Sequence, residues 1–163
     1  MPDVLTHVLV AYAVAGTAAR RGPLPDRYVS LACLGATMPD VMKAAVVAGT
    51  PLGALSGIAY SFWGVHTVGG VLALGGLGAL TIRPDDRRSA FAVLSAAGAG
   101  HLLLDLLVIR VDGSAPPYLF PFTGWLPPAG NLYASSDVWP AAVAIAIALP
   151  VFVGRARRDP DGG

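Results

Sequence analysis

The stretch AGAGHLLLDLLVI, residues 97–109, places an imidazole and a carboxylate in the middle of an apolar segment. His101 and Asp105 are four residues apart, so on a helix both side chains project from one face. An ionisable group inside an apolar membrane segment is costly and by default indicates function. The other two histidines have similar surroundings, since His7 lies in VLTHVLVAYAVAG and His66 in FWGVHTVGGVLALGG. The pattern therefore indicates a site built from histidine and aspartate.

Composition places the chain among integral membrane proteins. Its 163 residues are enough for one domain, 55% of them are hydrophobic and 13% are charged, against about 25% charged in soluble domains. Cys33 is the single cysteine, which excludes an intrachain disulfide and a cysteine-ligated zinc site. The first apolar run has no basic region before it, unlike a cleavable signal peptide. The net charge of +1 does not indicate a nucleic-acid partner, and we predict none.

Five apolar stretches are separated by helix breakers or charged residues, at roughly 4–19, 28–50, 63–82, 89–109 and 138–154. A membrane-spanning helix needs about 20 apolar residues. Pro39 should end or kink the second stretch near Met38, giving two half-helices or a segment that dips without crossing. We predict an all-α polytopic bundle of four to five transmembrane helices. It forms a single domain over residues 1–154, followed by a charged cytoplasmic tail over 155–163.

The basic residues predict an orientation. If all five stretches cross the membrane, nine of the ten arginines fall on one side, leaving Arg110 opposite and Lys43 within a span. Because basic residues favour the cytoplasmic side, we expect a multi-pass protein of the plasma (inner) membrane, with its N-terminus outside and its C-terminus in the cytoplasm. Loop 110–137 then faces outward, and its aromatic residues give it an interfacial character: Tyr118, Phe120, Phe122, Trp125 and Tyr133.

The same topology brings the histidines and two aspartates toward the outer end of the bundle, with Asp40 raised there by the Pro39 break. We predict a metal site whose ligands are His7, Asp40, His66, His101 and Asp105. Nitrogen and carboxylate ligands together suit zinc, and they tolerate manganese or iron. His7 either completes the shell or holds a second ion. Asp40 and Asp105 are the candidate catalytic residues, because a carboxylate that does not bind the ion can act as a base.

Each residue also has a simpler interpretation. His7 is explained by ordinary packing, His66 by a lipid headgroup, Asp40 by a helix N-cap, and His101 with Asp105 by a structural pair. Asp137 is interpreted as the N-cap of the last helix. Thr6 and Thr67 flank two histidines and are candidates to hydrogen-bond the ligands. The small residues at 69–78 and 97–100 predict close helix packing.

The ordered motifs Thr6-His7, Met38-Pro39-Asp40, Val65-His66-Thr67 and Gly100-His101-Leu102-Leu103-Leu104-Asp105, with the aromatic stretch 118–122, occupy residues 1–125. They resemble the YdjM-like family of LexA-binding, inner-membrane-associated hydrolases, often labelled membrane-bound metal-dependent hydrolases. The ligand order is also similar to that of zinc-dependent phospholipase C and related single-strand nucleases. This second resemblance implies that Asp40, His66, His101 and Asp105 hold one metal, and that Asp105 bridges to a second one held by His7.

The chain departs from the family pattern at several positions. Ser61 and Phe62 replace a histidine and an arginine, while Met42 and Lys43 replace an acid and a histidine after Pro39-Asp40. The resemblance implies a hydrolase that cleaves an ester or phosphoester, with a lipid as a possible substrate. Two alternatives remain open: a non-catalytic membrane scaffold or partner-binding protein with a structural metal site, and a small transporter or channel. The sequence does not assign an oligomeric state.

Overall fold

The computed structural model describes residues 4–57 and 62–158. In these ranges the chain forms six α-helices and three short 3-10 turns. The helices are α1 (Val4–Arg21), α2 (Arg27–Thr37), α3 (Val41–Ser56), α4 (Val68–Leu80), α5 (Arg87–Leu106) and α6 (Trp139–Ala156), and the turns are η1 (Met38–Asp40), η2 (Trp63–His66) and η3 (Pro84–Asp86). The described residues include no strand and only two isolated bridges. The all-α prediction is confirmed.

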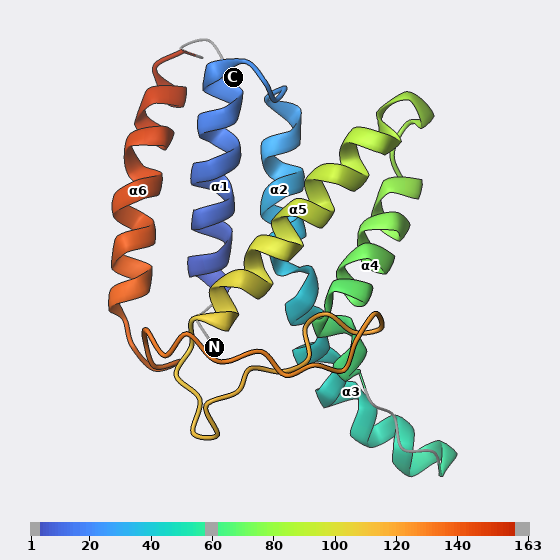
Figure 1. The fold of residues 1–163 in the computed structure, drawn as a ribbon. Helices are drawn as coiled ribbons and strands as arrows, with labels where there is room; N and C mark the ends of the chain where they lie inside the picture. The colour runs from blue at the N-terminus through green and yellow to red at the C-terminus, as the bar shows by residue number, and fades with distance from the viewer. Residues whose placement is uncertain (1–3, 58–61, 159–163) are drawn as a thin grey trace.

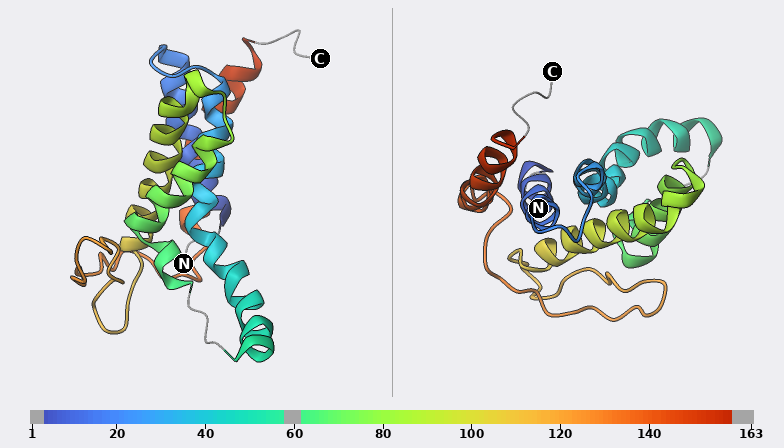
Figure 2. Two further views of the ribbon diagram at one scale, coloured as in Figure 1. Left: turned by 90° about the vertical axis from the view of Figure 1, so that its right-hand side faces the viewer. Right: turned by 90° about the horizontal axis from the view of Figure 1, so that it is seen from above.

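The helices form a bundle with one projecting arm (Figure 1). Helix α1 lies between α6 and α2, and α5 packs across α2 and beside α4. Helix α3 points away from the bundle, as both further views show (Figure 2). The long connection between α5 and α6 runs across the end of the bundle at which α1 begins and α5 ends.

The break at Pro39 occurs as predicted. Helix α2 ends at Thr37, and the 3-10 turn η1 separates it from α3, because proline has no backbone N–H to continue the helix. The third apolar stretch becomes helical later than expected, at Val68 and not near residue 63. Thr67 is extended there, and its hydroxyl oxygen accepts the Gly70 N–H at 3.2 Å as an N-cap.

These two interruptions shorten the helices that were expected to cross the membrane. Helix α2 has 11 residues and α4 has 13, whereas a spanning helix needs roughly 17–25. Within the described part of the chain, two segments are long and apolar enough to cross: Pro84–Leu106 and Trp139–Ala156. The count of four to five spanning helices therefore remains a prediction.

The arginine-bearing helix ends meet at the end of the bundle opposite the long connection (Figure 1). Arg27 pairs there with Asp86 across α2 and η3, with Nη2 to Oδ1 at 2.9 Å. Arg155 of α6 pairs with Asp26, and Arg158 donates to the Arg20 carbonyl at 3.3 Å. The bundle thus has one basic end, and two of its arginines, Arg27 and Arg155, are paired with aspartates there.

Close contacts between α2, α4 and α5 depend on glycine. A Cβ added to Gly35 would lie 2.6 Å from the Leu94 carbonyl oxygen, and one added to Gly98 would lie 2.7 Å from Val71 Cγ1. Both distances are below 3.0 Å, a separation that real Cβ atoms essentially never show. Gly98 therefore confirms the predicted packing role of the small residues near His101, whereas a Cβ added to Gly100 would meet no described atom within 4 Å. Gly35 and Gly98 let α5 pack closely against α2 and α4 beside the candidate site.

We expect Gly35→Ala to destabilise the protein by about 1–3 kcal/mol, because overpacking forces the backbone of α2 away from α5. Gly76→Ala is the matched control, since a Cβ there meets no described atom within 4 Å. That control should be neutral or stabilising, because alanine favours a helix over glycine by about 1 kcal/mol. Thermal unfolding in detergent measures both variants, and equal melting temperatures would contradict the close approach.

Candidate metal centre

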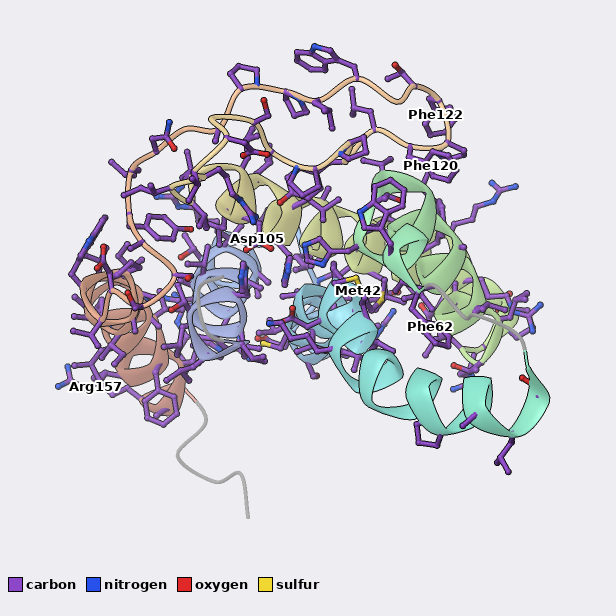
Figure 3. All side chains as sticks on the ribbon, turned by 90° about the horizontal axis from the view of Figure 1, so that it is seen from below. Met42, Phe62, Asp105, Phe120, Phe122 and Arg157 are labelled. Atoms are coloured by element: carbon purple, nitrogen blue, oxygen red, sulfur yellow. The ribbon has the colours of Figure 1, made fainter. Side chains whose placement is uncertain are left out.

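The five predicted ligands converge at one end of the bundle. His7 comes from α1, Asp40 from η1, His66 from η2, and His101 and Asp105 from α5. All five are buried, with at most 8% of any of them exposed. Figure 3 looks onto this end and shows Asp105 pointing into the centre of the bundle, where α1, α2 and α5 come together. Four separate segments of the chain therefore contribute to one cluster.

Asp105 is the hub of the cluster. Its Oδ2 lies 2.8 Å from His66 Nε2 and 3.6 Å from His101 Nε2, and its Oδ1 lies 3.4 Å from His7 Nε2. His101 Nε2 is also 3.8 Å from Asp40 Oδ1. The rings of His7 and His101 stack with their centroids 3.7 Å apart. One carboxylate is thus surrounded by the Nε2 atoms of all three histidines.

The break after α2 orients two of these rings. His101 Nδ1 lies 2.7 Å from the Ala36 carbonyl, and His66 Nδ1 lies 3.2 Å from the Pro39 carbonyl. Carbonyl groups near the end of a helix lack intrahelical donors, and a carbonyl only accepts, so each Nδ1 donates its proton. A neutral ring then presents the Nε2 lone pair to the carboxylates, which is the arrangement typical of metal-binding histidines.

These backbone partners were not identified from the sequence. A carbonyl oxygen is present at every residue, so no residue type marks the ones that orient a ligand. The available signal was Pro39, because a proline that ends a helix leaves the preceding carbonyls free to accept. The same residue therefore determines where α2 ends and how two ligands are oriented.

A divalent cation fits this donor set. In the described part of the chain, His101 Nε2, both ring nitrogens of His7 and Asp105 Oδ1 are buried and make no hydrogen bond, which is costly for polar atoms. His7, His101 and Asp105 form one group with ligand atoms within 4.8 Å of one another, and Asp40, His66 and His101 form a second. Ligands bound tetrahedrally at about 2.0–2.2 Å lie roughly 3.3–3.6 Å apart, which is close to the spacing observed.

Lys43 lies beside the cluster on the first turn of α3. Its Nζ is 2.7 Å from Asp40 Oδ1, although 42% of the lysine side chain is exposed. Lys43 therefore pairs with Asp40, which puts a fixed positive charge next to one candidate ligand. Ser61, the other notable departure from the family pattern, lies outside the described residues.

The sequence predicted that the aromatic residues of the long connection lie at the membrane interface. Two of its tyrosines are instead buried beside the cluster. Tyr118 is 5% exposed and its ring lies 5.8 Å from that of His66; Tyr133 is 4% exposed and donates to the Leu104 carbonyl at 2.6 Å. Burial raises the pKa of each hydroxyl to about 12, and the negative charge of Asp105 adds to the effect. Phe120, Phe122 and Trp125 are exposed, as expected of interfacial residues.

Two polar residues have roles other than those predicted. The Thr67 hydroxyl donates to the Gly64 carbonyl at 2.6 Å and accepts from Gly70, so it caps α4 and does not orient His66. Asp137 Oδ2 accepts the Ala134 N–H at 2.8 Å and closes a turn, while Val138 is the N-cap residue of α6. Both side chains bind nearby backbone, as short polar side chains commonly do in turns and caps.

Comparison with known proteins gives a family-level match. The family model described as YdjM inner membrane protein matches residues 1–161. No curated protein and no solved structure matches the chain. The match extends the resemblance from residue 125 through α6, so the last helix is also part of the family pattern.

Proposed function

The chain belongs to the YdjM inner membrane protein family, and we propose that it is a membrane-embedded, metal-dependent hydrolase that cleaves an ester or phosphoester, preferentially of a lipid. The observation that carries the proposal is the buried convergence of three histidines and two aspartates, in which His101 Nε2, both ring nitrogens of His7 and Asp105 Oδ1 make no hydrogen bond with the described residues. Zinc suits this mixed nitrogen and carboxylate set best, and manganese or iron would also bind.

The proposed placement in the membrane follows from the two ends of the bundle. The end that gathers the arginines lies on the cytoplasmic side, and the cluster lies in the outer half of the bilayer. The exposed aromatic residues of the long connection sit at the outer interface, where such rings are enriched. Helices α5 and α6 are long and apolar enough to cross the bilayer, and in this placement the shorter helices pack beside them within it. The expected partners are the bilayer and a lipid or phosphoester substrate.

The chain's residues have distinct roles in the proposed reaction. His66, His101, Asp40 and Asp105 hold the ion, and His7, stacked on His101, closes the side toward α1. The Ala36 and Pro39 carbonyls keep two imidazole rings aimed at the ion. A bound divalent ion supplies Lewis acidity that polarises the scissile group and activates water. A carboxylate oxygen of Asp40 or Asp105 that does not bind the ion takes the proton of the attacking water.

The test is hydrolysis of a fluorogenic phosphodiester and a fluorogenic carboxylic ester by purified protein supplied with zinc or manganese. We expect metal-dependent cleavage of at least one substrate, lost in His101→Ala and Asp105→Asn. Asp85→Asn, at an exposed aspartate of the basic end, should retain the wild-type rate. Stoichiometric metal without cleavage of either class would contradict hydrolysis.

The second candidate function is a non-catalytic scaffold or partner-binding protein with a structural metal site. The observation that favours it is Lys43, whose ammonium already neutralises Asp40. A structural site is fully coordinated by protein, whereas a catalytic one keeps a position for water or substrate. Tight metal binding combined with absent hydrolysis is the result expected of this alternative.

Lys43→Gln should increase the affinity for divalent cations several-fold, because it removes a positive charge that competes for Asp40. Lys43→Arg is the matched control and should leave the affinity close to that of the wild type. Titration with zinc against a competing chelator measures the three proteins. Weaker binding by Lys43→Gln would show that Lys43 supports the site and does not compete with the ion.

A further inference from the structure

An apolar cavity of about 390 Å³ opens from the metal cluster and runs between α1, α2 and α5. His7 and His101 line one end of it, and Pro23 and Leu24, in the connection between α1 and α2, line the other. Its volume lies within the range of about 300–1,000 Å³ that is usual for small-molecule sites. The cavity therefore joins the candidate site to the apolar body of the bundle.

The lining forms two continuous stripes on facing helices. On α1 it uses residues 7, 10, 11, 14, 15 and 18, and on α5 it uses residues 93, 96, 97, 100, 101 and 104. Both series follow the spacing of one helix face. Apart from the two histidines, the described lining residues are valine, alanine, leucine, proline and glycine. The wall thus offers polar contacts at one end only.

The length of the groove matches a hydrocarbon chain of one leaflet. The α1 stripe runs from His7 to Ala18, which are eleven residue steps apart, or about 16 Å at 1.5 Å per step. That is close to half of the roughly 30 Å hydrocarbon core of a bilayer. Small residues leave this space open, and a Cβ added to Gly100 would meet no described atom within 4 Å.

We infer that this groove binds the hydrocarbon chain of a lipid substrate and places its ester or phosphoester group at His7, His101 and Asp105. The inference rests on the proposed hydrolase function and names the substrate class of the same site. The head of the lipid lies at the cluster because both ring nitrogens of His7 and the Nε2 atom of His101 are buried there and make no hydrogen bond with the described residues. At the opposite end Arg27 and Arg155 are already paired with Asp86 and Asp26, so that end offers less to a headgroup.

Photolabelling in phosphatidylglycerol nanodiscs tests the polarity of the bound chain. Two single-chain lysophospholipids are used, one with a diazirine next to the headgroup and one with a diazirine at the chain end. The first probe should label residues near Val10 and Leu104, and the second should label residues near Ala18 and Val93. The reverse order would overturn the inference, because it would describe an ordinary lipid with its headgroup at the arginines.

A matched pair of variants tests whether labelling depends on the groove. Ala96 and Ala92 are both exposed alanines of α5, but only Ala96 lines the cavity. Ala96→Phe should at least halve the labelling of α1 and α5, and Ala92→Phe should leave it unchanged. Both variants should bind metal as the wild type does, which shows that the cluster has folded. Equal labelling of the two variants would overturn the inference.

The two proposals fail in different ways. Ordered labelling that depends on Ala96, without cleavage of any ester, supports the lipid groove and contradicts the hydrolase. Cleavage at a rate that is the same for short-chain and long-chain esters, and that Ala96→Phe does not change for either, supports the hydrolase and overturns the groove. Cleavage that accelerates as the acyl chain lengthens, and that loses this dependence in Ala96→Phe, supports both.

Discussion

Asp105→Asn is expected to weaken divalent-metal binding by more than about 100-fold, because loss of residues that merely support a ligand already costs 10–100-fold. Asp105 is fully buried and lies within 3.6 Å of the Nε2 atoms of all three histidines. The amide keeps the shape of the carboxylate but removes the charge that balances the cation. Zinc titration against a competing chelator gives the affinity.

Asp85→Asn provides the control for this loss of charge. Asp85 is an exposed residue of η3, at the far end of the bundle, so its variant should bind zinc as tightly as the wild type does. Near-wild-type affinity in Asp105→Asn would contradict the central role of Asp105. The cluster would then be better explained as a buried histidine–aspartate pair that cements α1, α5 and η2.

Removal of the metal is expected to lower the melting temperature by roughly 5–10 °C. A ligand present at 100 times its dissociation constant stabilises a protein by about 2.7 kcal/mol, and 1 kcal/mol corresponds to about 2–4 °C for a chain of 150–250 residues. The expected effect has a structural basis, because an ion held by the cluster would link α1, η1, η2 and α5. Differential scanning fluorimetry with and without EDTA measures it.

The Asp105→Asn variant tests whether the change in melting temperature comes from metal bound at the cluster. Asp105→Asn should melt at the same temperature with zinc and with EDTA, whereas the wild type should regain its higher melting temperature when zinc is added back. A wild-type protein whose melting temperature is independent of metal would contradict a structural link through the cluster.

The sequence was sufficient to predict which histidines and aspartates come together in the buried cluster. His101 and Asp105 share one helix face in any α-helix, and the Pro39 break follows from the missing N–H of proline. The arginine pattern predicted that the arginine-bearing helix ends lie on one side of the protein. The structure places these helix ends at one end of the bundle (Figure 1). These features depend on local spacing or on the distribution of charge along the chain, and both can be read without knowing how the helices pack.

Features that depend on tertiary packing could not be predicted in the same way. Tyr118 and Phe122 are both aromatic residues of the long connection, so the sequence predicted the same interfacial position for both. In the structure Tyr118 packs against His66, whereas 72% of Phe122 is exposed. Thr67 begins α4 because its extended backbone follows the turn η2, and residues 63–66 look equally apolar in sequence. The projection of α3 away from the bundle has no counterpart in its composition.

The most direct test of the account is the metal content of detergent-purified protein that has not been exposed to chelators. Elemental analysis should find about one zinc or manganese ion per chain. X-ray absorption at the edge of that metal should show imidazole and carboxylate ligands at about 2.0–2.2 Å. Folded protein without stoichiometric metal, or with metal that lacks imidazole ligands, would contradict the metal centre and the hydrolase built on it.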